Sequence, residues 1–290
     1  MSGMNFATVW VQDMNQLSAS CSYLPQWRIS IVRSQCFILI IGSDLFISFR
    51  GTELPQLRSD WSDFLSIREF LADWLTNVQY KLVKFRADIP GRVHLGFLQA
   101  VDVLWRLINP VLAEFTAANP DGRVFVTGHS QGAALAILTV AKLLYIRRVE
   151  VQRVADDHSA PPAPPFQIRM CVFAPPLVGD ASFVEGMNAR AAAVGAQLIR
   201  FTNPKDPIPL LPPDNRYAPG PGIHVHLEED QRTQTAAGQA NEWYNAHLPL
   251  EVDFFFSALP RLKYHFLAGP GIGDVRPGYL PLLLAYPPQC

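Results

Sequence analysis

A serine flanked by glycines is the feature that most constrains the fold of this chain. Residues 128–132 read Gly-His-Ser-Gln-Gly and match the pattern G-x-S-x-G, with Ser130 at its centre. The β-branched run 123–127 precedes the pattern, and the Ala- and Leu-rich run 133–146 follows it, so it lies between a predicted strand and a predicted helix. In this context the glycines let the two elements approach closely while the serine occupies a sharp, strained turn. The pattern therefore predicts a nucleophile at the end of a strand.

Strand-like and helix-like segments alternate along most of the chain. Apolar spacing predicts helices over 64–80, 96–119 with a kink at Pro110, and 181–193, and strands over 36–41, 45–49, 167–173 and 197–201. The first two strands are separated by Gly42-Ser43-Asp44, which predicts a hairpin with a three-residue turn. Alternation of this kind indicates an α/β fold, with a mostly parallel central sheet that is flanked by helices on both faces.

Length and composition are consistent with one catalytic domain. A chain of 290 residues can fold as a single α/β unit, so we expect one domain over 1–290. Residues 156–165 contain four prolines and no apolar period, which predicts a loop insertion. The net charge of −1, without a run of Lys or Arg, argues against a nucleic-acid partner. The four cysteines are scattered and indicate no disulfide framework.

The N-terminal residues do not resemble a secretory signal. Residues 1–16 lack a basic start, and Asp13 and Asn15 interrupt the apolar positions, so we expect a cytoplasmic or non-classically exported protein. No apolar stretch approaches the ~18 residues that a transmembrane helix needs. We therefore expect no transmembrane segment, although transient contact with a lipid interface is compatible with the 49% hydrophobic content.

A nucleophilic serine needs a histidine that removes its proton and a carboxylate that orients this histidine. In α/β-hydrolases these residues follow in the order Ser, acid, His, and the acid lies on a loop after a later strand. Asp206 stands just past the predicted strand 197–201 and fits this position. Asp180 precedes a predicted helix and fits an N-terminal cap, whereas Asp214 lies deeper in a Pro-rich loop. Asp206 is the predicted acid.

Six short blocks, in this order along the chain, resemble the class 3 lipases, the fungal-lipase-like branch of the α/β-hydrolases. The blocks are 49–52 (Phe-Arg-Gly-Thr), 73–75 (Asp-Trp-Leu), 93–97 (Val-His-Leu-Gly-Phe), the serine turn 128–132, 173–179 (Phe-Ala-Pro-Pro-Leu-Val-Gly) and 206–212 (Asp-Pro-Ile-Pro-Leu-Leu-Pro). The resemblance implies an oxyanion hole formed by Thr52 and the backbone N–H of Gln131. Gln131 replaces the leucine that is usual in the family, but only its backbone is needed for this role.

The family resemblance places the catalytic base near the C-terminus. His265 follows the acid by 265 − 206 = 59 residues, a spacing similar to that of family members, and is the predicted base. His247 follows it by 247 − 206 = 41 residues and remains the alternative, because residues 246–249 lead into a predicted helix. His224 and His226 resemble a non-catalytic histidine that the family carries in the strand after the acid loop.

The resemblance also implies a lid over residues 53–72. Trp61 and Phe64 are its apolar anchors, mixed with charged residues, and such an amphipathic segment can cover an apolar cleft or settle into a lipid surface. A helix packed permanently on the sheet is the alternative. His224 and His226, followed by Glu228, offer no identifiable third ligand, so we expect no metal site and no cofactor.

The expected function is serine-dependent hydrolysis of carboxylic esters through an acyl-enzyme intermediate. The resemblance implies a lipase that acts on acylglycerols or related lipid esters. A phospholipase A1 and a short-chain esterase share the same machinery and remain alternatives. A lipase-like protein that is catalytically silent and uses its cleft for binding or signalling is the alternative from another class, since a fold by itself does not determine function.

Overall fold

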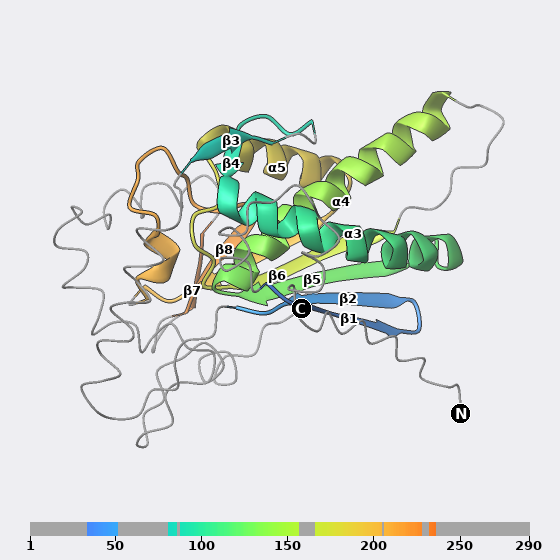
Figure 1. The fold of residues 1–290 in the computed structure, drawn as a ribbon, viewed down its shortest axis with the longest axis horizontal. Coiled ribbons are helices and arrows are strands. Elements are labelled where there is room, and N and C mark those ends of the chain that lie inside the picture. Colours follow the sequence, from blue (N-terminus) through green and yellow to red (C-terminus); the bar gives the residue numbers. More distant parts are fainter. Residues whose placement is uncertain are drawn as a thin grey trace, which may run out of the picture.

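In the part of the chain that the structure describes, seven strands form one sheet (Figure 1). The computed structural model describes residues 34–51, 81–85, 88–156, 166–204, 206–227 and 232–235. In spatial order the strands are β1 (Cys36–Ile41), β2 (Asp44–Phe49), β5 (Arg123–His129), β6 (Gln167–Phe173), β7 (Gln197–Thr202), β8 (Ile223–Leu227) and β9 (Arg232–Thr235). All pairs from β2 to β8 are parallel, and only the two outer pairs are antiparallel. The predicted α/β architecture is confirmed.

The three long helices that the structure describes lie on the same face of this sheet. They are α3 (Leu95–Ala118), α4 (Gln131–Asp156) and α5 (Ala181–Ala193), and Figure 1 shows all three above the strands. Strand order explains this placement, because each parallel strand from β2 to β7 lies next to the one before it, always on the same side. Right-handed crossovers that always advance in the same direction must all pass over the same face. The predicted helical cover of the opposite face concerns residues outside the described ranges and stays a prediction.

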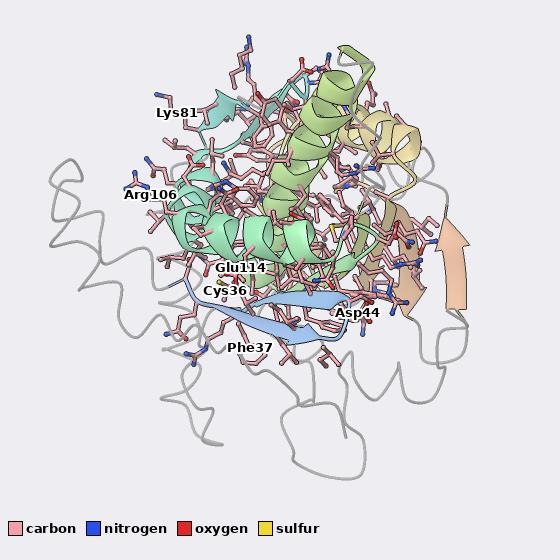
Figure 2. All side chains as sticks on the ribbon, turned by 90° about the vertical axis from the view of Figure 1, so that its right-hand side faces the viewer. Cys36, Phe37, Asp44, Lys81, Arg106 and Glu114 are labelled. Carbon is pink, nitrogen blue, oxygen red and sulfur yellow. The ribbon has the colours of Figure 1, made fainter. Side chains whose placement is uncertain are left out.

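Strand alternation places one set of side chains beneath the helices. Leu45, Ile47, Val124, Val126 and Val172 are buried on that face and belong to the main core. On the opposite face, Phe46 stacks on Phe125 and both are half-buried, whereas Phe173 stacks on the buried Phe201 within a second, smaller apolar cluster. Figure 2 shows β1 and β2 from the side, with the helices above them and Phe37 pointing away from the helices.

The first hairpin has a tighter turn than predicted. Asp44 belongs to β2 and pairs with Ile41, so that only Gly42 and Ser43 connect the strands. Gly42 has a φ of +59°, and a positive φ at the first central residue is the requirement of a two-residue type II′ turn. The prediction of a three-residue turn is therefore wrong by one residue, because Asp44, although aspartate is a common turn residue, already pairs as the first residue of β2.

Helix α4 follows the serine turn and forms the centre of the core. Residues 133–141 are all buried, because alanines let this helix lie close to the sheet while leucine and isoleucine fill the space around it. The helix continues to Asp156, ten residues beyond the predicted end at Ile146. Asp156 was predicted to open the Pro-rich loop and is helical instead; residues 157–165 lie outside the described ranges.

Helix α3 confirms the predicted helix over 96–119 to within one residue at each end, and Pro110 lies inside it. The helix is long and apolar enough to cross a membrane by length and composition alone. Its buried positions recur at helical spacing and pack into the main core; they are Phe97, Ala100, Val101, Leu104, Ile108, Leu112 and Phe115. Such a stripe is what a core helix of a globular domain shows.

A second, two-stranded sheet precedes α3. It pairs β3 (Leu82–Lys84) with β4 (Arg92–His94). This sheet was not predicted, since strands of three residues are too short to show an alternating pattern. The β4 strand also carries Val93, which bridges to Gly179, and Gly179 in turn bridges to Ala218. These bridges tie the loops after β6 and β7 to the start of α3.

Candidate active site

Ser130 occupies a strained turn between β5 and α4. Its φ is +57°, a left-handed conformation that a non-glycine residue adopts at an energetic cost. The backbone N–H of Ser130 donates to the carbonyl of Phe173 at 3.0 Å, and its carbonyl accepts from Ala133 N at 2.9 Å. The turn is therefore fastened to the neighbouring strand β6 on one side and to the first turn of α4 on the other. The predicted context of a strand followed by a helix is confirmed.

Glycines make this turn possible, because neighbouring backbone segments approach so closely that a Cβ would clash with them. A Cβ on Gly128 would collide with the carbonyl oxygen of Gly132, and one on Gly132 would collide with the carbonyl oxygen of Phe49. A Cβ on Gly51 would lie 2.8 Å from the carbonyl oxygen of His129 and 3.5 Å from Cβ of Ser130. The end of β2 thus packs directly against the serine turn.

Asp206 is the buried acid at this edge of the sheet. It lies four residues after the end of β7 and is only 1% exposed. Its N–H donates to the carbonyl of Asn203 at 2.9 Å, and its Oδ1 accepts from the N–H of Ile208, also at 2.9 Å. These two bonds orient the carboxylate within a tight turn, as aspartates commonly do in loops.

The two competing aspartates have other partners. Asp180 caps α5, because its carboxylate accepts from Phe183 N at 2.9 Å, as the sequence predicts. Asp214 pairs with Arg216, whose Nε lies 2.9 Å from Oδ2, and the neighbouring guanidinium holds the pKa of Asp214 below its usual value. Both competitors are thus engaged in other local roles, and the buried Asp206 remains the better candidate acid.

Strand order brings Ser130 and Asp206 to the same edge. Phe173, the last residue of β6, pairs with His129 of β5 on one side and with Phe201 of β7 on the other. Both candidate residues follow the carboxyl ends of their strands, separated by the single strand β6. Two strand spacings amount to about 10 Å, a gap that one imidazole with its two hydrogen bonds can bridge.

Three histidines near this edge are buried. His94 begins α3, where its Nδ1 accepts from the N–H groups of Gly96 at 3.1 Å and Phe97 at 3.4 Å. Burial lowers the pKa of His94 to about 4. His224 and His226 lie in β8, in the strand after the acid loop as the resemblance implies, and their rings are 3.9 Å apart. Their burial agrees with the non-catalytic part expected for them.

Several predicted site residues lie outside the described ranges. They are Thr52, the lid 53–72 with Trp61 and Phe64, and the two possible bases His247 and His265. Among the residues that the structure does describe, no group of three metal-ligating side chains comes together.

The sequence patterns missed two features of the site. The carbonyl of Phe173 holds the Ser130 turn, and Ala174, the next residue, also has a positive φ of 48°. Ala174 N donates in turn to the carbonyl of Phe201 at 2.9 Å, so one short segment connects the serine turn to β7. Nothing local could have indicated these contacts, because they depend on which strand lies beside β5.

Comparison of the sequence with known proteins finds lipases. The sequence model of the family described as "Lipase (class 3)" matches residues 46–216, which is more than half of the chain. A lipase of Rhizopus niveus is 26% identical over 88% of this chain and 55% of its own length. A phospholipase A1 of Oryza sativa subsp. indica, EG1, is 26% identical over 58% of this chain and 36% of its own length. The chain thus spans about half or less of the length of these curated relatives.

Solved structures show the same fold. The crystal structure of lipase II from Rhizopus niveus superimposes with a TM-score of 0.56 at 18% sequence identity, and the match covers 84% of this chain and 78% of that one. The described strands and helices therefore form an α/β-hydrolase fold.

Proposed function

Because the chain belongs to the class 3 lipase family, we propose that it hydrolyses carboxylic esters of lipids through a nucleophilic serine, Ser130. The observation that carries this proposal is the conformation of Ser130. Ser130 has a φ of +57°, and backbone hydrogen bonds hold it on two sides. The glycines around it let β2, β5 and α4 approach so closely that a Cβ at their positions would clash. A serine that serves only as a turn residue does not need this arrangement. Backbone strain of this kind clusters at functional sites, where it presents a side chain to a substrate.

In the first step, Ser130 Oγ attacks the ester carbonyl carbon while the base accepts the hydroxyl proton. The base is His265 in this proposal, with His247 as the alternative. Asp206 holds the base in the required tautomer and stabilises its positive charge. The tetrahedral intermediate then collapses, and the alcohol leaves with the proton from the base. A water molecule then gives up a proton to the same base and attacks the acyl carbon. When this second intermediate collapses, the bond to Ser130 Oγ breaks, the base returns the proton to Oγ, and the carboxylic acid leaves.

The negative charge on the carbonyl oxygen needs donors beside Ser130. Gln131 is the first residue of α4, so its N–H belongs to the positive end of the helix dipole. Thr52 is the second donor that we propose. A Cβ on Gly51 would lie 3.5 Å from Cβ of Ser130. Consecutive Cα atoms across a trans peptide are only ~3.8 Å apart. This chain connection to Gly51 supports Thr52 as the proposed second donor.

Acylglycerols or related lipid esters are the proposed substrates. The relatives named lipase and phospholipase A1 support this class of ester, and the phospholipase A1 keeps phospholipids as a second candidate. Short esters remain the alternative, because the proposed lid over 53–72 would decide which esters reach Ser130.

The test measures hydrolysis of a p-nitrophenyl ester and of emulsified triacylglycerol by wild-type protein and by Ser130→Ala. Ser130→Ala should lose activity by a factor on the order of 10⁶ while unfolding at the same temperature as wild type. Asp206→Asn should lose roughly 10⁴-fold, because the base is then held in the wrong tautomer. Wild-type protein without activity on any ester, and without labelling by a serine-reactive phosphonate, would instead support a silent binding protein.

A further inference from the structure

A buried polar pair lies beneath the turn that carries Asp206. Thr202 is the last residue of β7, and its hydroxyl shares a hydrogen bond with Nε2 of His224 in β8. Both side chains are 0% exposed. A buried hydrogen bond between side chains of adjacent strands is costly to replace by water, and it therefore restrains both strands where it occurs.

The position of this pair is specific within the sheet. Thr202 pairs with His226 and Arg200 with His224 in the parallel register of β7 and β8. Alternation consequently turns these four side chains to the helix-covered face. Thr202 is the last residue of β7 that pairs with β8. Its hydrogen bond to His224 therefore restrains the last paired residue before the turn that carries Asp206.

The chain leads from this pair directly to the proposed acid. The residue after Thr202 is Asn203, whose carbonyl accepts the N–H of Asp206 at 2.9 Å. The carboxylate of Asp206 accepts in turn from Ile208 N. A shift of the β7 end thus displaces Asn203 and, through one hydrogen bond, Asp206. Catalysis by a carboxylate and histidine is sensitive to such shifts, since about 1 Å of misplacement can cost ~10²-fold in rate.

We infer that Thr202 and His224 are positioning residues: their buried hydrogen bond holds the end of β7 so that the carboxylate of Asp206 faces the catalytic base. This inference rests on the proposed role of Asp206. His224 suits the task because it stays neutral. Burial lowers its pKa far below the usual value, and the nearby Arg200 and His226 act in the same direction, so the bond persists over the working pH range.

The experiment compares Thr202→Val, which keeps the shape and removes the hydroxyl, with Thr202→Ser, which restores it. Thr139→Val is the matched control, because Thr139 is also fully buried but lies in α4, away from the acid turn. Thr202→Val should lower kcat about 10- to 100-fold with KM within about twofold of wild type. Thr202→Ser and Thr139→Val should keep kcat within about threefold of wild type.

The pH profile separates positioning from a merely structural role. A misplaced carboxylate stabilises the imidazolium less, so the pKa of the base falls and the acidic limb of kcat/KM should move to lower pH in Thr202→Val. The double variant Thr202→Val/Asp206→Asn should be no slower than Asp206→Asn alone, because both changes act on the same group. If Thr202→Val folds poorly, His224→Gln supplies the same comparison, with thermal unfolding measured alongside.

The inference is overturned if Thr202→Val loses stability while kcat and the acidic limb stay at wild-type values. It is also overturned if the losses of Thr202→Val and Asp206→Asn multiply in the double variant. In either case a large loss in Asp206→Asn alone leaves the proposed function standing. An Asp206→Asn protein with wild-type activity contradicts both the acid assignment and the inference built on it.

Discussion

Ser130 combines an unfavourable backbone conformation with a half-buried side chain. The cost of a positive φ at a non-glycine residue, about 1–2 kcal/mol, must be offset by the surroundings. Here the carbonyl of Phe173 and the first turn of α4 hold the residue on both sides. These contacts keep Ser130 at the end of β5, where the proposed mechanism brings a substrate carbonyl and a base to its hydroxyl.

The identity of the base is the first prediction at this scale. Only one histidine can accept the Ser130 proton while pairing with Asp206, so His265→Ala and His247→Ala should differ sharply. His265→Ala should lower kcat on the order of 10⁶-fold, whereas His247→Ala should cost little. The measurement is turnover of a p-nitrophenyl ester. Full activity in His265→Ala together with loss in His247→Ala reverses the assignment and leaves Ser130 and Asp206 in place.

Gly132 provides a second prediction, because alanine is ordinarily the better helix residue. Gly132→Ala should nevertheless destabilise the protein by about 2–3 kcal/mol, since the added methyl group meets the carbonyl oxygen of Phe49 and, at 2.8 Å, the carbonyl carbon of Arg50. It should also lower kcat, because Gly51 and the serine turn are pushed apart. Urea unfolding and ester turnover measure the two effects.

Gly195→Ala is the control for Gly132→Ala. Gly195 has a φ of +67°, but a Cβ there would meet nothing within 4 Å. Its replacement should cost only about 1–2 kcal/mol from backbone strain and leave turnover unchanged. Equal stability and equal turnover in the two variants would contradict the packing that we describe around the serine turn.

Among the elements, α3 has a cap that depends on protonation. His94 must be neutral at Nδ1 to accept from Gly96 and Phe97, and burial lowers its pKa from 6.5 to about 4. The unfolded chain therefore binds this proton at higher pH than the folded protein does. A lowered pKa in the folded state means that stability is complete above pH 6.5 and is lost as the pH falls toward 4.

The expected loss from His94 between pH 7.5 and pH 4.5 is about 2–3 kcal/mol in the free energy of unfolding. His94→Asn tests it, because asparagine caps helices well and does not titrate. Burial also lowers the pKa of His224, so wild type and His94→Asn should both lose stability on acidification. The difference between the two losses in the free energy of unfolding is the contribution of His94. Urea unfolding at the two pH values is the measurement. Equal losses in the two proteins would contradict the role of this cap.

The proposed lid over 53–72 is the second element with a measurable consequence. Trp61 and Phe64 should matter for substrates at a lipid interface more than for soluble esters, since only the former require insertion of apolar side chains. Replacing both residues by serine should lower activity on emulsified long-chain triacylglycerol at least tenfold more than activity on a p-nitrophenyl ester. A loss by the same factor on both substrates indicates a helix packed permanently on the sheet.

At the scale of the whole molecule, the order of the parallel strands determines which loops lie side by side. Strands β5, β6 and β7 are parallel neighbours in chain order, so their carboxyl ends form one continuous edge. Loops that follow parallel strands gather at this edge, and ligands of open α/β sheets bind there. The crossover helices α3, α4 and α5 pass over the same face, and the main core packs between them and the strands that end at this edge.

Local signals were sufficient for the serine turn, the helices α3 and α5, and the cap that Asp180 forms in front of α5. Each rests on a few adjacent residues: glycines where backbones collide, apolar residues at helical spacing, and a cap in front of a helix. The two-residue hairpin turn and the end of α4 were predicted less accurately, because neighbouring strands and the packing of the core influence where an element stops.

Only the tertiary structure decided which groups meet around these residues. The carbonyl of Phe173 beside Ser130, the hydrogen bond from Thr202 to His224, and the single face that carries the described helices all follow from strand order and register. These contacts join residues that are 20 to more than 40 positions apart in the sequence. The local sequence around each residue does not indicate which strand will lie beside it. The sequence thus determined the chemistry that is available, whereas the order of the strands determined which of its groups come together.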